Sequence, residues 1–268
     1  MRLPFLVIIF ILLLWLWAWA TSPLRGGLVL ECLDAGPGQC WIIHTPRGST
    51  VVVNCGSADP RNRPGAAALR ALARLGVNRL DAIILTRTEP DAASGVAELL
   101  DEMPSDALLC GGDPAGLLSG SGWQQLRPGM KIRLQDGLEL EVHGAGGQVE
   151  CVTARWKQAR VALVDRLSPG CSRFLATFDP QALAVSYAAS REPSGVPPGL
   201  APAVAVLSSG RSRATWADYG LRRSLESVAG TVCNTGRDGG VWLCIRGGRV
   251  EVRTARQGRL HSPDIRTR

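Results

Sequence analysis

The longest uninterrupted apolar stretch of the chain lies close to its start. Residues 3–24 read LPFLVIIFILLLWLWAWATSPL and contain no charged side chain. A helix needs about 20 apolar residues to span a bilayer, and the tryptophans in the second half of the stretch suit a membrane interface. Because Arg2 and the amino group precede the stretch, we expect a single membrane-spanning helix with the remaining chain outside the cytoplasm. Residues 18–20, AWA, also fit a small-x-small cleavage pattern, so a cleaved signal peptide is the alternative.

Beyond this segment, short apolar runs alternate with amphipathic stretches. Runs of about four to eight apolar or alternating residues bounded by turn-forming residues predict β-strands. Such strands are expected at residues 27–36, 39–45, 49–56, 80–86, 106–110, 130–134, 138–144, 149–156, 160–165, 203–209, 231–235, 240–245 and 249–254. Helical periodicity predicts helices at residues 64–77, 91–103 and 215–230. We expect Gly76 to end the first helix and Asp91 to cap the second.

The order of these elements predicts a layered α/β domain. The helices are scattered among two sets of strands that we expect to be mostly antiparallel. Neither an internal repeat nor a second linker is evident, so one domain over residues 25–254 is the simplest division. Residues 255–268 form a basic tail that we expect to be disordered.

The composition agrees with a folded, basic domain. Hydrophobic residues make up 46% and charged residues 20% of the 268 positions, which excludes an intrinsically disordered chain. The formal net charge of +7 is carried almost entirely by arginine. These arginines form no stripe interleaved with aromatic residues, so the sequence identifies no nucleic-acid-binding face.

Eight cysteines are spread along the chain without any C-x-x-C spacing, which argues against a zinc ribbon. The first predicted hairpin places Cys40 opposite Cys55, and the last predicted hairpin places Cys233 opposite Cys244. An oxidising compartment would permit disulfides at both places. The alternative is that these cysteines are small, buried, apolar residues.

Three stretches near the start of the domain carry a family resemblance. They read LDAGPGQC at residues 33–40, TPRG at residues 45–48 and VVVNCG at residues 51–56. In order and spacing they resemble the L-D-V-G-Q-G-D-A, T-P-D-G and L-L-I-D-A-G stretches of the C-terminal domain of ComEC-type DNA-uptake proteins, which has the metallo-β-lactamase fold. The resemblance implies an αββα sandwich, preceded in this chain by the expected membrane helix.

The metal-binding loop of that family is altered in this chain. The family pattern is T-H-x-H/D-x-D-H-x-G-G, in which imidazole and carboxylate ligands converge on two metal ions. Laid on this pattern, Thr86 and Asp91 match, Glu89 stands at the second ligand position, and Arg87 and Ala92 replace histidines. Arg87 therefore places a fixed positive charge where a cation would bind, and it could pair with Glu89 or Asp91 instead.

The other positions implied by the resemblance are altered as well. Asp165 follows a strand at the place of the metal-bridging aspartate, Asn54 replaces the aspartate of D-A-G, and Tyr187 replaces a histidine. The three histidines, His44, His143 and His261, fall at no ligand position. The candidate residues of a former metal site are thus Arg87, Glu89, Asp91, Asp165, Asn54, Asp34 and Tyr187.

These observations leave three functions open. The first is a catalytically inactive metallo-β-lactamase-like domain, anchored in the inner (cytoplasmic) membrane through residues 3–24, that binds DNA, a membrane channel protein or another envelope partner and needs no cofactor. The second is a metal-dependent phosphodiesterase or nuclease that holds one divalent ion through Glu89, Asp91 and Asp165. The third is a structural assembly module, in which Asp91 is a helix cap and Asp165 a turn residue.

Overall fold

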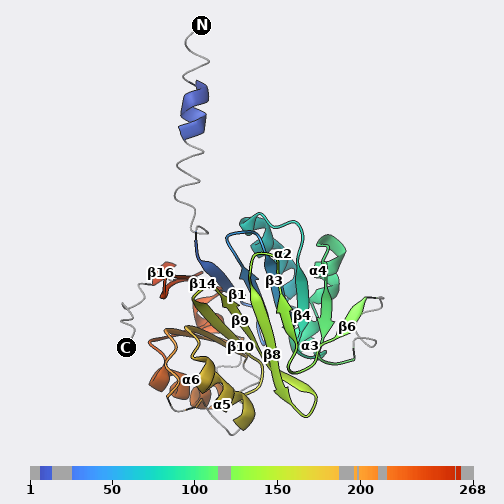
Figure 1. Cartoon of the computed structure of the whole chain (residues 1–268), viewed down its shortest axis with the longest axis vertical. Helices are drawn as coiled ribbons and strands as arrows, with labels where there is room; N and C mark the ends of the chain where they lie inside the picture. The colour runs from blue at the N-terminus through green and yellow to red at the C-terminus, as the bar shows by residue number, and fades with distance from the viewer. Residues whose placement is uncertain are drawn as a thin grey trace.

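The computed structural model describes residues 7–13, 26–113, 122–186, 196–197, 199–210, 216–256 and 258–260. Two β-sheets pack face to face, and helices cover the outer face of each sheet (Figure 1). The layers follow the order helix, sheet, sheet, helix, as expected for an αββα sandwich.

The first sheet has the strand order β16-β15-β14-β1-β2-β3-β4-β5-β6. Its strands are β1 (Leu28–Cys32), β2 (Gly38–His44), β3 (Thr50–Ser57), β4 (Ala82–Leu85), β5 (Leu108–Cys110), β6 (Trp123–Gln125), β14 (Val241–Arg246), β15 (Arg249–Thr254) and β16 (Gly258–Leu260). Its outer face is covered by α2 (Pro64–Leu75), α3 (Pro90–Ala93) and α4 (Val96–Glu102).

The second sheet has the strand order β13-β12-β11-β10-β9-β8-β7. Its strands are β7 (Lys131–Arg133), β8 (Glu139–Ala145), β9 (Gln148–Trp156), β10 (Ala159–Val164), β11 (Ala182–Ser186), β12 (Val204–Ser208) and β13 (Thr231–Asn234). Helices α5 (Pro169–Phe178) and α6 (Trp216–Val228) lie on its outer face, and the short helix α7 (Thr235–Asp238) follows β13.

Alternation along the strands divides the apolar side chains among three cores. One face of each sheet contributes to a core between the sheets, in which Leu30, Trp41 and Leu163 are fully buried. The opposite faces pack beneath the helices: Ile42 lies under α2 and α4, and Leu183 lies under α5 and α6. Because burial of apolar area drives folding, the continuous runs of the sequence correspond to strands that are covered on both faces.

The two ends of the sandwich are distinct. Strands β3, β4 and β10 finish at the same end, because Arg87, which follows β4, contacts Asp165, which follows β10. We call this the site end. Strand β1 begins at the opposite end, where Val29 pairs with His44 at the close of β2. We call this the entry end, because the N-terminal segment joins the domain there (Figure 1).

The expectation of mostly antiparallel strands is confirmed for the first sheet, where five of the eight described strand pairs are antiparallel, but not for the second, where only three of six are. Strands β3 to β6 are parallel, and so are β10 to β13. Parallel neighbours require crossover connections, and helices supply most of them. One of these, α5 between β10 and β11, was not expected from the sequence. It begins with Ser168, whose hydroxyl accepts a hydrogen bond from the Cys171 amide, followed by Pro169 at its first position.

The helix expected at residues 91–103 is in fact two helices, α3 and α4. They are separated by Gly95, where a Cβ atom would lie 2.5 Å from the Gly65 backbone nitrogen. Asp91 does not cap this segment. Glu89 holds the N-cap position of α3 without a side-chain hydrogen bond, and the Asp91 carboxylate binds Arg87 instead. Helix α2 ends at Gly76 as expected, with φ of 71°.

The hairpin over residues 39–56 forms as expected, and Cys40 lies opposite Cys55. The second expected cysteine pair is wrong. Cys233 lies in β13 of the second sheet and Cys244 in β14 of the first, because α7 redirects the chain between them. All eight cysteines are buried free thiols.

The two termini of the chain lie partly outside the described residues. Residues 7–13 of the expected membrane segment are helical, with Val7 to Leu13 exposed. Within the described ranges, no helix reaches the length and hydropathy needed to cross a bilayer. Residues 258–260, which fall in the expected disordered tail, form β16 and pair with β15.

Candidate functional site

The site end carries a hydrogen-bonded pair of side chains at the ends of β3 and β4. The Asn54 amide donates to the Thr86 hydroxyl at 2.9 Å, and the Thr86 backbone amide donates to Asn54 Oδ1 at 2.9 Å. Asn54 has a φ of 54°, a left-handed conformation that asparagine adopts more readily than most residues. The pair therefore fixes the start of the loop that carries Arg87.

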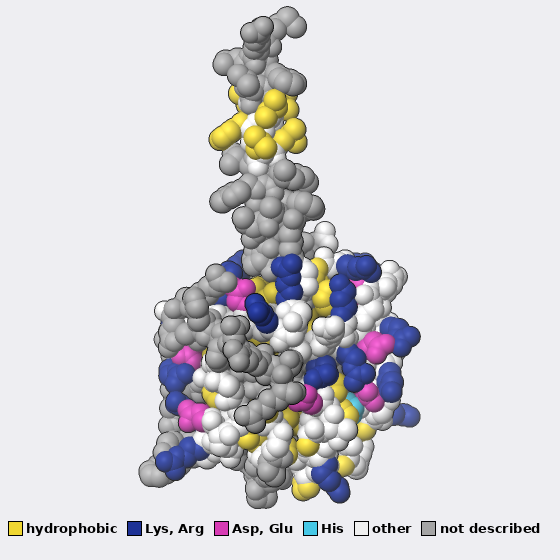
Figure 2. All heavy atoms as spheres, turned by 60° about the vertical axis from the view of Figure 1, so that its left-hand side comes forward, with side chains coloured by type: hydrophobic (Ala, Val, Ile, Leu, Met, Phe, Trp, Pro, Cys, Tyr) yellow, Lys and Arg dark blue, Asp and Glu magenta, His cyan; other side chains and the backbone are white. Residues whose placement is uncertain are grey.

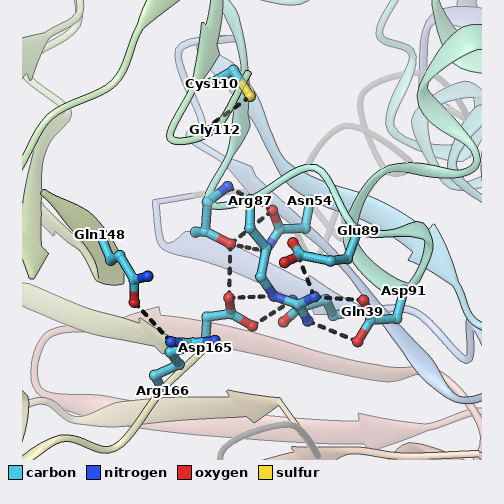
Figure 3. Close-up of polar contacts among 11 residues, drawn as sticks. Gln39, Asn54, Arg87, Glu89, Asp91, Cys110, Gly112, Gln148, Asp165 and Arg166 are labelled. Atoms are coloured by element: carbon cyan, nitrogen blue, oxygen red, sulfur yellow. Dashed lines mark hydrogen bonds and ion pairs between the residues drawn. The ribbon is translucent and has the colours of Figure 1, made fainter. Parts of the chain in front are cut away.

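Arg87 is the centre of the site (Figure 3). Its guanidinium donates two hydrogen bonds to the Asp91 carboxylate, from Nη1 to Oδ1 at 2.5 Å and from Nη2 to Oδ2 at 2.8 Å. Its Nε donates to Asp165 Oδ2 at 2.7 Å. Glu89 lies farther away, with Oε2 at 3.5 Å from Nη1. Arginine presents its donors in a planar fork, so one side chain can join a carboxylate on α3 to a carboxylate of the other sheet.

Asp165 is the most deeply placed carboxylate of this network. Its side chain is fully buried, and it accepts hydrogen bonds from Arg87, from the Thr86 hydroxyl at 3.1 Å and from the Gln39 amide at 2.6 Å. A buried carboxylate is tolerated only when it is paired and hydrogen-bonded. These donors meet that requirement and also link the two sheets.

Burial and charge act in opposite directions on Arg87. The side chain is only 15% exposed, and burial by itself would lower the pKa of the guanidinium. The hydrogen bond to Asp91 and the charge of Asp165 outweigh this, so the pKa of Arg87 is raised above its ordinary value. Arg87 is therefore a permanent cation. Because three carboxylates surround it, the site as a whole is net negative.

The structure brings together five of the seven residues expected from the sequence. Arg87, Glu89, Asp91, Asp165 and Asn54 form one connected set. Asp34 is also at the site end but faces Arg256, whose Nη2 is 3.8 Å from Asp34 Oδ2. Tyr187 lies outside the described residues.

Sequence reasoning missed Gln39 as a member of this set. Gln39 is fully buried, and its Oε1 atom has no hydrogen-bond partner. The signal was available in the alternation of β2, because Gln39 shares the inward face of Trp41 and Ile43. A glutamine on such a face needs a polar partner.

The side chains present do not fit a metal ion. Among the described residues, no group of three or more His, Cys, Asp and Glu side chains is arranged to hold one. The guanidinium of Arg87 lies between Asp91 and Asp165 and donates hydrogen bonds to carboxylate oxygens of both. A divalent ion about 4 Å from that guanidinium would be repelled by roughly 8 kcal/mol at an effective dielectric of 20. His44 and His143 lie elsewhere, bonded to Thr50 and Thr153.

Among the described residues, no histidine belongs to the network to act as the base of a nucleophilic centre. His44 and His143 bind threonines elsewhere, and the Asp165 carboxylate is fully buried and already accepts three side-chain hydrogen bonds. A general base needs a free lone pair within reach of a substrate proton. The chemistry that this arrangement supports is the fixed positioning of the loop over residues 86–91 against the second sheet.

Comparisons with known proteins identify the fold. No protein-family model and no curated protein sequence matches the chain. Among solved structures, it is similar to the metallo-β-lactamase fold protein YhfI from Bacillus subtilis, with a TM-score of 0.54 and 11% identity over 77% of this chain and 95% of that one. It is also similar to a variant of the CmlA β-hydroxylase, with a TM-score of 0.54 and 12% identity over 81% of this chain and 54% of that one. At such identities the likeness concerns architecture alone, and the chain has the metallo-β-lactamase fold.

Proposed function

We propose that this protein is a membrane-anchored domain of the metallo-β-lactamase fold that acts by binding and does not catalyse metal-dependent hydrolysis. The observation that carries the proposal is the position of Arg87 between Asp91 and Asp165. A guanidinium there neutralises the carboxylates that a metal ion would need. The anchor is the apolar segment of residues 3–24.

The charge of the site constrains what it can bind. Three carboxylates around one guanidinium leave the site net negative, which opposes contact with a phosphate backbone. The resemblance to ComEC-type proteins supports a role at the cell envelope, with DNA or a membrane channel protein as partner. Of these two, the acidic site favours a protein partner that presents basic or neutral polar groups to Glu89, which is 57% exposed.

The test begins with metal content and turnover of the purified full-length chain. After equilibration with zinc, manganese and magnesium, we expect far less than one ion per chain by elemental analysis. We also expect no hydrolysis of a phosphodiester or a β-lactam that a metal chelator abolishes. Arg87→His should raise metal binding, because it removes the fixed charge and adds an imidazole next to Asp91 and Asp165. Arg61→His, at an exposed ion pair, is the matched control and should not.

The competing function is a hydrolase with one ion held by Glu89, Asp91 and Asp165. Stoichiometric metal in the native chain, with turnover that chelation and Asp91→Ala both abolish, would establish it and overturn our proposal. Whether the partner is DNA or a protein is a separate question. Fluorescence anisotropy with single- and double-stranded DNA, at low and high salt, tests DNA binding. Tight binding with a steep salt dependence would favour DNA over a protein partner.

A further inference from the structure

The entry end of the domain must lie close to the membrane if residues 3–24 anchor the chain. Only residues 25–27 separate the apolar segment from β1, which begins at Leu28. From residue 24 to residue 28, a fully extended chain spans at most about 14 Å. The start of β1 is therefore held near the bilayer surface, and the site end faces away from the membrane.

Exposed cations lie at the turns of this end. Arg246 closes β14, and a Cβ atom built on Gly26 would lie 3.4 Å from its Nε, so this guanidinium lies against the point where the chain enters. Arg47 lies in the turn between β2 and β3, and Lys157 in the turn between β9 and β10. All three side chains are exposed. Figure 2 shows several Lys and Arg side chains on the part of the domain nearest the N-terminal segment, with others spread over the rest of this face.

Three acidic residues at the same end are already engaged. Asp81 accepts a hydrogen bond from the Thr50 amide, Asp106 pairs with Arg79, and Asp136 accepts from the Thr45 hydroxyl. Arg47, Lys157 and Arg246, in contrast, form no ion pair with a carboxylate among the described residues. Their charge is left available for a partner outside the domain.

We propose that the entry end is a membrane-facing surface that binds anionic phospholipid headgroups through Arg47, Lys157 and Arg246. The inference rests on the anchor in our proposed function. Headgroups attract basic side chains that lie within a Debye length of the surface. With the entry end held there, the domain has one orientation, and the Arg87 site is presented to partners away from the bilayer.

Hydrogen–deuterium exchange on the full-length chain in lipid nanodiscs tests this proposal. In phosphatidylglycerol-containing nanodiscs we expect the turns over residues 45–49 and 246–249 to exchange several-fold more slowly than in phosphatidylcholine nanodiscs. High salt should remove the difference, because it screens the headgroup charge. The turn over residues 145–148, at the site end, should exchange equally in both lipids.

Charge reversal supplies the matched variants. The triple variant Arg47→Glu, Lys157→Glu and Arg246→Glu should lose the protection by anionic lipid. The variant Arg61→Glu, Arg127→Glu and Arg173→Glu changes the net charge equally at exposed positions outside the entry end, and it should keep the protection. Equal exchange in both lipids, protection of the site-end turn, or an intact mass lacking residues 1–20 would overturn the inference. The loss of residues 1–20 would also remove the anchor from the proposed function. The two exchange results leave that anchor and the metal and turnover measurements untouched, so a failure of the lipid inference can be told apart from a failure of the proposed function.

Discussion

At the scale of single residues, Arg87 stands out because its side chain joins parts of the chain that are far apart in sequence. Asp165 is fully buried and depends on Arg87 for its counter-charge, whereas the comparable pair of Arg61 with Asp59 lies at the surface. Removing one partner of a buried pair costs far more than removing an exposed partner, because the remaining charge stays out of water. The loss of Arg87 should therefore reduce the free energy of unfolding far more than the loss of Arg61, although both belong to arginine–aspartate pairs.

We predict that Arg87→Ala lowers the free energy of unfolding by about 3 to 5 kcal/mol. Arg61→Ala should lower it by less than about 1 kcal/mol. Urea unfolding followed by circular dichroism measures both. Arg87→Ala combined with Asp165→Asn should recover part of the loss, because the neutral amide no longer needs a counter-charge. Equal, small effects for Arg87→Ala and Arg61→Ala would show that the network contributes little to stability.

At the scale of elements, the hairpin of β2 and β3 contains a histidine, His44, whose effect on the pH dependence of stability has a definite direction. His44 is buried at the end of β2, and its Nδ1 lies 2.8 Å from the Thr50 hydroxyl. Burial lowers the pKa of His44, although the charges of Asp136 and Asp81 partly oppose this. The unfolded chain, with a histidine pKa of about 6.5, therefore binds more protons than the folded chain just below that pH. Stability contributed by His44 is present above this pH and is lost as the pH falls.

We predict that the free energy of unfolding of the wild type, relative to that of His44→Gln, rises between about pH 5 and pH 7. The slope is at most about 1.4 kcal/mol per pH unit for one histidine. Using the difference cancels the other titrating groups, including Glu31, whose pKa is raised by burial. Chemical denaturation at several pH values supplies the curves. A difference that falls as the pH rises would contradict the lowered pKa.

The sequence predicted local elements better than their pairing. The strand patterns of β2, β3 and β10 and the stop at Gly76 depend on nearby residues, and the structure has them where expected. Parallel pairing depends on crossover connections, whose direction no local pattern records. At the site, the place of Arg87 on the family's metal-binding pattern led us to expect that it could pair with Glu89 or Asp91, and the structure has both contacts. The contact of Gln39 with Asp165 joins residues 126 positions apart and could not be predicted from local pattern.

At the scale of the whole molecule, the three apolar cores share the two sheets, so opening one exposes the others. Each core contains cysteines: Cys233 lies between the sheets, Cys55 beneath α2, and Cys171 beneath α5. Burial raises the pKa of Cys32 and Cys233, which lie in the core between the sheets. Because the thiolate is the reactive form, the folded protein should protect all of these thiols from alkylation.

We predict that, in the reduced protein, the cysteines of the three cores are alkylated by iodoacetamide at one common rate. That rate should follow global unfolding and rise together for all sites in moderate urea, because no core opens without the sheet it shares with its neighbour. Peptide mass spectrometry at timed intervals resolves each cysteine. Earlier labelling of Cys151 and Cys171 than of Cys40 and Cys55 would mean that the second sheet opens by itself. The contacts of Arg87 and Gln39 with Asp165 would then be too weak to make the sandwich a single cooperative unit.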